Sequence, residues 1–283
     1  MDESAADTKG FNLNPSNTSN PVIAPGNEGP RFDRNALYYD MSGDKYLIIL
    51  NHYTFKKTVY FKNKQPSTRN GTDNDVKSLK KVFGSFGFDT TNVFRDLEYP
   101  DIIKKLTQIA TKDHSKTSCI CVTILTHGDK GGELHAADRP YLLTDVITIF
   151  EKQPGLVNKP KLFFVQACRG GNTDAGKSVQ LDSEGVLTVP THADFLLLCS
   201  TVEDYLSFRD VNGSWMIQAL CHIVSEYYED LDLLHMITLV NRQVAYDRSS
   251  YTPGNTHTHN KKQMPETRFT LTKLLKFRAE SKE

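Results

Sequence analysis

The 283-residue sequence lacks the features that direct a chain into a membrane, onto a nucleic acid or out of the cell. No apolar run approaches the ~20 residues that a membrane-spanning helix needs. The first ten residues, MDESAADTKG, are acidic and contain no apolar core of a secretory signal. Lys plus Arg and Asp plus Glu both total 34, so the net charge is zero and no surface for a polyanion is indicated. We therefore expect a cytoplasmic protein with neither membrane nor nucleic-acid partners.

Cysteine is scarce, and the number of cysteines is odd. The five are Cys119, Cys121, Cys168, Cys199 and Cys221. An odd count without a secretory signal argues against a framework of disulfides. Cys119 and Cys121 lie two apart in an apolar run, and no second pair of ligands follows them, so buried side chains are favoured over a metal site. The sequence predicts neither a metal nor a cofactor.

Two stretches have too few apolar residues to fold on their own. Residues 10–30 contain five Asn and four Pro, which predicts a disordered arm over 1–31 and a folded part that begins near Phe32. Residues 169–190 are small and polar and show no period. A loop of 22 residues without secondary structure is long for a compact domain, so we expect an exposed linker here.

The rest of the chain alternates short apolar runs with helical periodicity. Strands are expected at 45–51, 118–125, 161–166, 193–199 and around 268–274, and helices at 73–86, 100–110, 144–152, 215–228 and 233–246. Strands that alternate with helices predict an α/β fold, in which helices cover both faces of a mostly parallel sheet. Two chain segments, joined by the linker, would build one sheet.

Two reactive side chains follow the ends of predicted strands. Cys168 comes just after the strand at 161–166, and His127, followed by Gly128, comes just after the strand at 118–125. In open parallel sheets, ligands bind beyond the carboxyl ends of the strands, so these side chains would meet at one edge. A cysteine beside a histidine is a potent nucleophile, and a glycine lets the backbone approach a substrate oxygen. The alternative for Cys168 alone is a buried structural thiol.

Residues 166–170 read QACRG, the pentapeptide typical of caspases, and His127 precedes the cysteine by 41 residues. Similar stretches are YLIILNH (46–52), TRNGTDNDVKSL (68–79), LTHGD (125–129), KLFFVQACRG (161–170), ADFLLLCST (193–201), SFRD (207–210), GSWMIQALC (213–221) and NRQVA (241–245). The chain resembles the caspase family, executioner type, over residues 32–278. The resemblance implies a caspase-like three-layer sandwich and an endopeptidase that cuts after aspartate.

The resemblance also implies roles for individual residues. Cys168 would be the nucleophile, His127 would shuttle the proton, and the backbone N–H groups of Gly128 and Cys168 would form the oxyanion hole. The pocket for the aspartate side chain would be lined by Arg69, Gln166 and Arg209. Two planar guanidinium groups match a carboxylate in shape and charge, which is consistent with this assignment.

The neighbouring subsites depart from the family pattern. The resemblance assigns them to Leu206, Ser207, Phe208 and Trp215. Many executioner caspases have Tyr and Trp where this chain has Leu206 and Phe208, and Pro-Gly where it has Glu203-Asp204. The second pocket should therefore stay apolar but have a different outline. Trp215 also opens an amphipathic helix, for which core packing is the alternative.

By resemblance, the chain is a precursor with a prodomain (1–31), a large subunit (32–182) and a small subunit (183–283), and two such pairs assemble into a dimer. Only Asp174 and Asp182 lie in the linker; Asp182 is farther from Cys168 and precedes a small residue, so a cut after Asp182 is expected. Asp7 is the expected site of trimming in the arm.

Expected partners are protein substrates with exposed aspartates and an upstream activating caspase. Three alternatives stay open: a catalytically silent homologue that titrates caspases, an active caspase without a role in cell death, and an initiator. The arm of ~31 residues is short for a recruitment domain, which disfavours the initiator.

Overall fold

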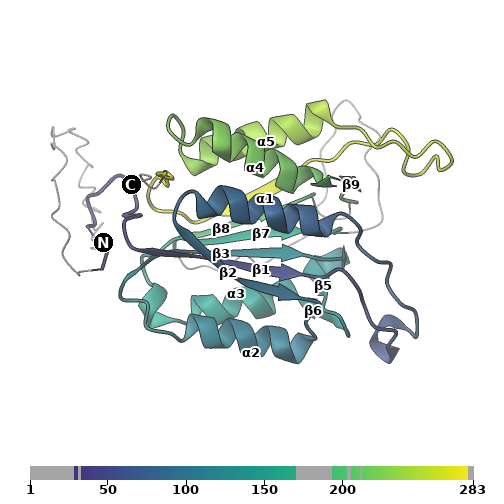
Figure 1. The fold of residues 1–283 in the computed structure, drawn as a ribbon, viewed down its shortest axis with the longest axis horizontal. Helices are drawn as coiled ribbons and strands as arrows, with labels where there is room; N and C mark the ends of the chain where they lie inside the picture. Colours follow the sequence, from purple (N-terminus) through teal and green to yellow (C-terminus); the bar gives the residue numbers. More distant parts are fainter. Residues whose placement is uncertain (1–28, 31–32, 170–192, 203–204, 211, 280–283) are drawn as a thin grey trace, which may run out of the picture.

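A computed structural model of the chain describes residues 29–30, 33–169, 193–202, 205–210 and 212–279 (Figure 1). The predicted disordered arm, apart from residues 29–30, and all of the predicted linker after Arg169 lie outside these ranges. Within them, the structure has the three layers that the sequence pattern predicts.

A six-stranded sheet forms the middle layer, in the order β11-β8-β7-β3-β1-β2. The strands are β1 (Asp44–Asn51), β2 (Phe88–Arg95), β3 (Thr117–Leu125), β7 (Lys161–Gln166), β8 (Phe195–Cys199) and β11 (Glu266–Phe269). All neighbours are parallel except β11, which runs antiparallel to β8. Strands β7 and β8 pair over five positions, from Lys161↔Phe195 to Val165↔Cys199. The predicted mostly parallel sheet is confirmed.

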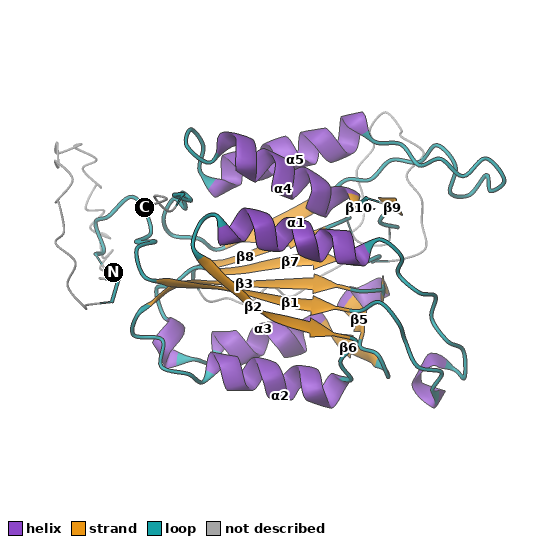
Figure 2. Ribbon diagram, in the orientation of Figure 1, coloured by secondary structure: helices purple, strands orange, loops and turns teal. Residues whose placement is uncertain are grey.

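Helices cover both faces of this sheet (Figure 2). One face carries α1 (Thr72–Gly84), α4 (Trp215–Tyr227) and α5 (Leu233–Asp247), and the other carries α2 (Tyr99–Ala110) and α3 (Leu143–Glu151). Strand side chains alternate between the two faces. Leu47 and Ile49 of β1 accordingly join the core under α1, α4 and α5, whereas Ile48 and Leu50 join the core under α2 and α3.

Several elements differ from the sequence expectation. Strand β2 was not predicted, because its sequence FDTTNVFR is polar and only partly buried at the sheet edge. The final strand ends at Phe269 instead of continuing to 274, since Leu274 leaves the sheet and pairs with Leu37 and Tyr39. Two small antiparallel sheets also lie outside the central one. They are β4 (Gly128–Asp129), β5 (Glu133–His135) and β6 (Pro140–Leu142), and β9 (Arg209–Asp210) with β10 (Gly213–Ser214).

The register of the sheet determines which loops meet. Leu125 at the end of β3 pairs with Gln166 at the end of β7, and the N–H of Thr126 donates to the carbonyl of Gln166 (3.1 Å). Residues 126–128 and 167–169 therefore leave adjacent strands at the same edge. No helix in the described ranges is both long and apolar enough to cross a membrane.

Candidate active site

A cavity of about 230 Å³ opens at this edge of the sheet. Its lining comprises Arg69, Thr126, His127, Gln166, Cys168, Ser207, Phe208 and Arg209. The structure thus brings together side chains from four chain segments, the first and last of which are more than a hundred positions apart in the sequence. The expected residues outside the lining lie next to it: Gly128 follows His127, Leu206 precedes Ser207, and the ring of Trp215 packs 5.0 Å from that of Phe208.

Cys168 differs from the other cysteines in exposure. It is half-buried in the cavity wall, whereas Cys119, Cys121, Cys199 and Cys221 are buried, as predicted for Cys119 and Cys121. Burial raises the pKa of the Cys199 thiol to about 11 and that of the Cys119 and Cys221 thiols to about 12. The thiolate is the reactive form of cysteine, so these buried thiols are inert near neutral pH. The Cys168 sulfur instead lies in the open cavity, where the backbone N–H of Ser207 donates to it (3.5 Å).

His127 is held in a defined tautomer. Its Nε2 lies 2.8 Å from the carbonyl oxygen of Ser67. A carbonyl can only accept, so Nε2 carries the proton and Nδ1 keeps its lone pair. Burial, opposed by the hydrogen bond to Ser67 and assisted by the nearby cation Arg69, lowers the pKa of His127 to about 4. The imidazole is therefore neutral near pH 7 and can accept a proton.

Gly128 lies where the loops after β3 and β7 come closest. A side chain at this position would place its Cβ 2.4 Å from the carbonyl oxygen of Cys168 and 2.8 Å from that of Glu133. Real Cβ atoms do not come so close to backbone oxygen, so any larger residue would push the two loops apart. Glycine is required here by close packing of the backbone.

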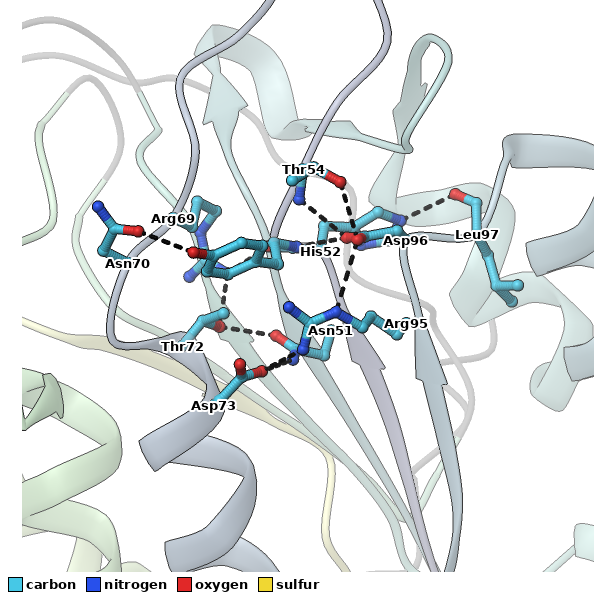
Figure 3. Close-up of polar contacts among 11 residues, drawn as sticks. Asn51, His52, Thr54, Arg69, Asn70, Thr72, Asp73, Arg95, Asp96 and Leu97 are labelled. Atoms are coloured by element: carbon cyan, nitrogen blue, oxygen red, sulfur yellow. Dashed lines mark hydrogen bonds and ion pairs between the residues drawn. The ribbon is translucent and has the colours of Figure 1, made fainter.

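Arg69 is almost completely buried, with 1% of its surface exposed, and a polar network holds it (Figure 3). Its Nη1 donates to the carbonyl of His52 (2.9 Å) and to Oγ1 of Thr72 (2.8 Å), and Thr72 in turn donates to Oδ1 of Asn51 (2.7 Å). Burial, with a contribution from the positive charge of Arg209, lowers the pKa of Arg69 to about 9. The guanidinium stays protonated near pH 7.

Two buried polar atoms beside the cavity have no partner among the described residues. They are Nε of Arg69, a donor, and Oε1 of Gln166, an acceptor. Arg209 adds a second guanidinium. Its own Nε donates to the carbonyl of Asn70 (2.6 Å), which holds the group in place. Buried polar atoms in native proteins are nearly always paired. Two cations and unused polar atoms in one cavity therefore indicate a site for a small anionic group.

Asp75 is a buried carboxylate that acts on both arginines. Its charge attracts Arg69 and Arg209, and the backbone N–H and Oγ of Ser214 donate to its two oxygens (2.7 and 2.6 Å). Burial raises the pKa of Asp75, which these hydrogen bonds and the arginines oppose. Neither Asp75 nor Ser67 was predicted from the sequence. Asp75 looks like an ordinary polar position of α1, and Ser67 contributes a backbone atom, which leaves no side-chain signal.

Beneath the site, His52 is buried and neutral, which predicts a loss of stability in acid. Burial lowers the pKa of His52 from 6.5 to about 4, and its Nε2 donates to the carbonyl of Leu97 (3.0 Å). As the pH falls below 6.5, the unfolded chain takes up a proton that the folded protein excludes. His52 should therefore lower the free energy of unfolding by about 2 kcal/mol between about pH 7.5 and pH 5.

Urea denaturation of wild type and His52→Gln at these two pH values measures this contribution. The amide of Gln can still donate to Leu97 but cannot titrate. We expect the variant to lose less stability in acid than the wild type, whatever its stability at neutral pH. Equal losses of unfolding free energy in the two proteins would show that His52 does not cause the loss of stability in acid.

Some predicted residues lie outside the described part of the chain. These are the expected cleavage sites Asp182, Asp174 and Asp7, and the pair Glu203-Asp204 beside the second pocket.

An α/β sheet that presents a cysteine, a neutral histidine and an anion pocket at the carboxyl ends of its strands defines a cysteine peptidase. The family model described as caspase domain matches residues 44–276. The chain belongs to the caspase family, and it is a cysteine-type endopeptidase that cleaves after aspartate.

Similar proteins align with this chain over most of its length and most of their own. Caspase drICE of Drosophila melanogaster is 35% identical over 257 residues, which are 87% of this chain and 74% of the relative. Caspase-3 of Xenopus laevis is 37% identical over 238 residues, 81% of this chain and 79% of the relative. The protein in the crystal structure of caspase-1 from Spodoptera frugiperda is 37% identical in sequence to this chain, and the two structures superpose with a TM-score of 0.79. The match covers 90% of this chain and 99% of that one.

Proposed function

We propose that Cys168 and His127 carry out the reaction as nucleophile and proton carrier. The Cys168 sulfur attacks the backbone carbonyl carbon of the substrate aspartate, and its proton passes to Nδ1 of His127. The C–N bond then breaks, the leaving amine takes that proton, and water hydrolyses the thioester. The backbone N–H groups of Gly128 and Cys168 stabilise the oxyanion. The observation that supports this most is the shared cavity of Cys168 with a histidine whose Nε2 proton is fixed by Ser67.

We propose that Arg69, Gln166 and Arg209 bind the aspartate side chain. The support is the pair of guanidinium groups and the unpartnered Nε of Arg69, which an incoming carboxylate would satisfy. Leu206, Ser207, Phe208 and Trp215 would form the neighbouring subsites. The packing of Phe208 on Trp215 makes an apolar wall there.

In the cell, we propose an executioner of apoptosis, stored in the cytoplasm as an inactive precursor. Relatives named drICE and caspase-3 and five unpaired cysteines support this setting. An upstream caspase would cut the precursor into a large subunit (32–182) and a small subunit (183–283). Two such pairs would then form the working dimer.

Activation is expected to require cleavage after Asp182. Asp182 lies 14 positions after Cys168, far enough along the linker to enter another protease, and Ser183 after it is small. Incubation of the Cys168→Ala precursor with an active caspase should give one fragment that ends at Asp182 and one that begins at Ser183. Mass spectrometry of the fragments identifies the cut.

The variants Asp182→Ala and Asp174→Ala form a matched pair for this test. The first should stay intact and gain little activity, whereas the second should mature normally. The reverse pattern would show that Asp174 is the activating site.

Two alternative functions are distinguishable. A silent homologue that titrates caspases would not turn over short aspartyl peptides. An active caspase without a role in cell death would turn them over, but its expression in cultured cells would not cause death beyond that seen with the Cys168→Ala variant.

A further inference from the structure

The loop between β1 and α1 presents an exposed, positively charged turn at residues 57–64. Figure 1 shows this loop, with its single helical turn Val59–Phe61, reaching beyond the carboxyl ends of the strands. Val59 is 71% exposed and Tyr60 is 54% exposed. Lys57, Lys62 and Lys64 are also exposed, and no acidic side chain in the described ranges pairs with them. In a chain of zero net charge, this is a local excess of cations beside apolar surface.

The 57–64 turn has a fixed backbone. Lys62 and Asn63 both adopt the left-handed conformation (φ of 54° and 56°), and the N–H of Asn63 donates to the carbonyl of Thr58 (2.8 Å). The Thr58 hydroxyl donates to the carbonyl of Asp138 (2.7 Å) and so ties the turn to the neighbouring loop. Left-handed conformations cost energy in residues with side chains, and such strain is concentrated at binding sites. The turn therefore presents its exposed side chains without first having to fold.

The same loop builds one wall of the catalytic site. The ring of Phe55 packs 5.0 Å from that of His127, and Ser67 accepts the hydrogen bond from His127 Nε2. Phe61 in the turn packs 5.0 Å from His135, whose ring lies 6.2 Å from that of His127. The turn is therefore connected to the catalytic histidine through two layers of rings. A histidine that protonates the leaving amine lies on the side of the substrate that follows the scissile bond.

We propose that the 57–64 turn is a second binding surface for protein substrates, and that it binds an acidic segment with apolar side chains on the C-terminal side of the cut. This inference rests on the proposed roles of Cys168 and His127. Lys57, Lys62 and Lys64 supply charge complementarity, which raises the rate of encounter, and Val59 supplies apolar surface that the segment covers. A segment bound there would hold the scissile bond near the cavity without any contact to the aspartate pocket.

The test compares three fusion substrates with one cleavage sequence. In the first, a flexible Gly/Ser linker of ~10 residues and a Glu/Leu-rich tail follow the cut; in the second, the same tail precedes it; in the third, a Ser/Gly tail of equal length follows it. At about 50 mM salt, we expect the processed wild-type enzyme to cleave the first with a kcat/KM about 5- to 10-fold above the others. The advantage should disappear at about 0.5 M salt.

The variant K57E/K62E/K64E should lose this advantage while its turnover of a short aspartyl peptide stays unchanged. The matched control K80E/K81E/K112E makes the same change in net charge at exposed lysines of α1 and of the residues after α2, and it should keep the advantage. Val59→Ser should reduce the advantage about twofold at about 50 mM salt, because it removes apolar contact surface and Val59 supports no core.

Equal cleavage of the three fusions by the wild type would overturn the proposal, as would an equal loss in the control variant. Weaker binding of K57E/K62E/K64E to single-stranded DNA or to anionic vesicles, with unchanged substrate preference, would also overturn it. Failure of the wild type to cleave the short peptide would instead contradict the proposed catalytic roles.

Discussion

Replacement of Cys168 by alanine is expected to lower the turnover of a peptide ending in aspartate by about 10⁴-fold or more. The variant lacks the only cysteine sulfur that reaches the cavity, so neither the attack nor the covalent intermediate is available. His127→Ala should lose nearly as much, because the two side chains act as one unit and their effects do not add. Initial rates with a fluorogenic peptide measure both.

The fold should tolerate these changes. The described hydrogen bonds of the Cys168 sulfur are to Ser207 alone, and Cys168 belongs to neither hydrophobic core, so its removal should leave the cores intact. Cys221→Ala is a matched control: it removes a buried sulfur from α4, costs some stability, and should leave the rate unchanged. Substantial turnover by Cys168→Ala, with a melting temperature near that of the wild type, would refute the assigned nucleophile.

A peptide that ends in asparagine should be cleaved at least about 100-fold less efficiently than its aspartate counterpart. The cavity holds two guanidinium groups, and Nε of Arg69 has no described partner. A neutral amide of the same shape would leave these cations unpaired and would bring its own NH₂ group against them. The ratio of kcat/KM for the two peptides measures the effect.

Arg209→Gln tests whether the pocket causes this preference. Arg209 is only partly buried whereas Arg69 is buried, so its replacement should disturb the fold less. The variant should cleave the aspartate peptide far more slowly and the asparagine peptide about as fast as before. The ratio of kcat/KM for the aspartate peptide to that for the asparagine peptide should therefore fall. A ratio near one in the wild type, or an unchanged ratio in the variant, would show that the carboxylate is bound elsewhere.

Much of the architecture follows from apolar runs in the sequence. Strand β7 was predicted with its observed bounds, since KLFFVQ is buried on both sides and flanked by polar loops. The convergence of His127 and Cys168 at one edge also follows, because β3 and β7 are adjacent parallel strands. A run of apolar residues is therefore sufficient to predict a strand when every residue of that strand is buried.

The features that were not predicted depend on context. Strand β2 has Asp, Thr and Asn at positions that only a neighbouring strand stabilises. The contribution of Ser67 comes from its carbonyl, which every residue has, so no residue type identifies it. Asp75 lies close enough to attract Arg69 and Arg209, and Ser214, 139 positions away, donates two hydrogen bonds to this buried carboxylate.

The pairing of β7 with β8 joins the two segments on either side of the proposed cut. Five residue pairs of the central sheet connect them, and the helices α4 and α5 cover a core shared with β1 and β3. After a cut in the linker, non-covalent contacts of this kind, including the hydrogen bonds from Leu274 to Leu37 and from Ser214 to Asp75, hold the two fragments together. Unfolding then changes from a unimolecular to a bimolecular equilibrium, in which the midpoint depends on protein concentration. Dilution, which cannot separate two segments of one intact chain, would then separate the two fragments of a chain cut in the linker.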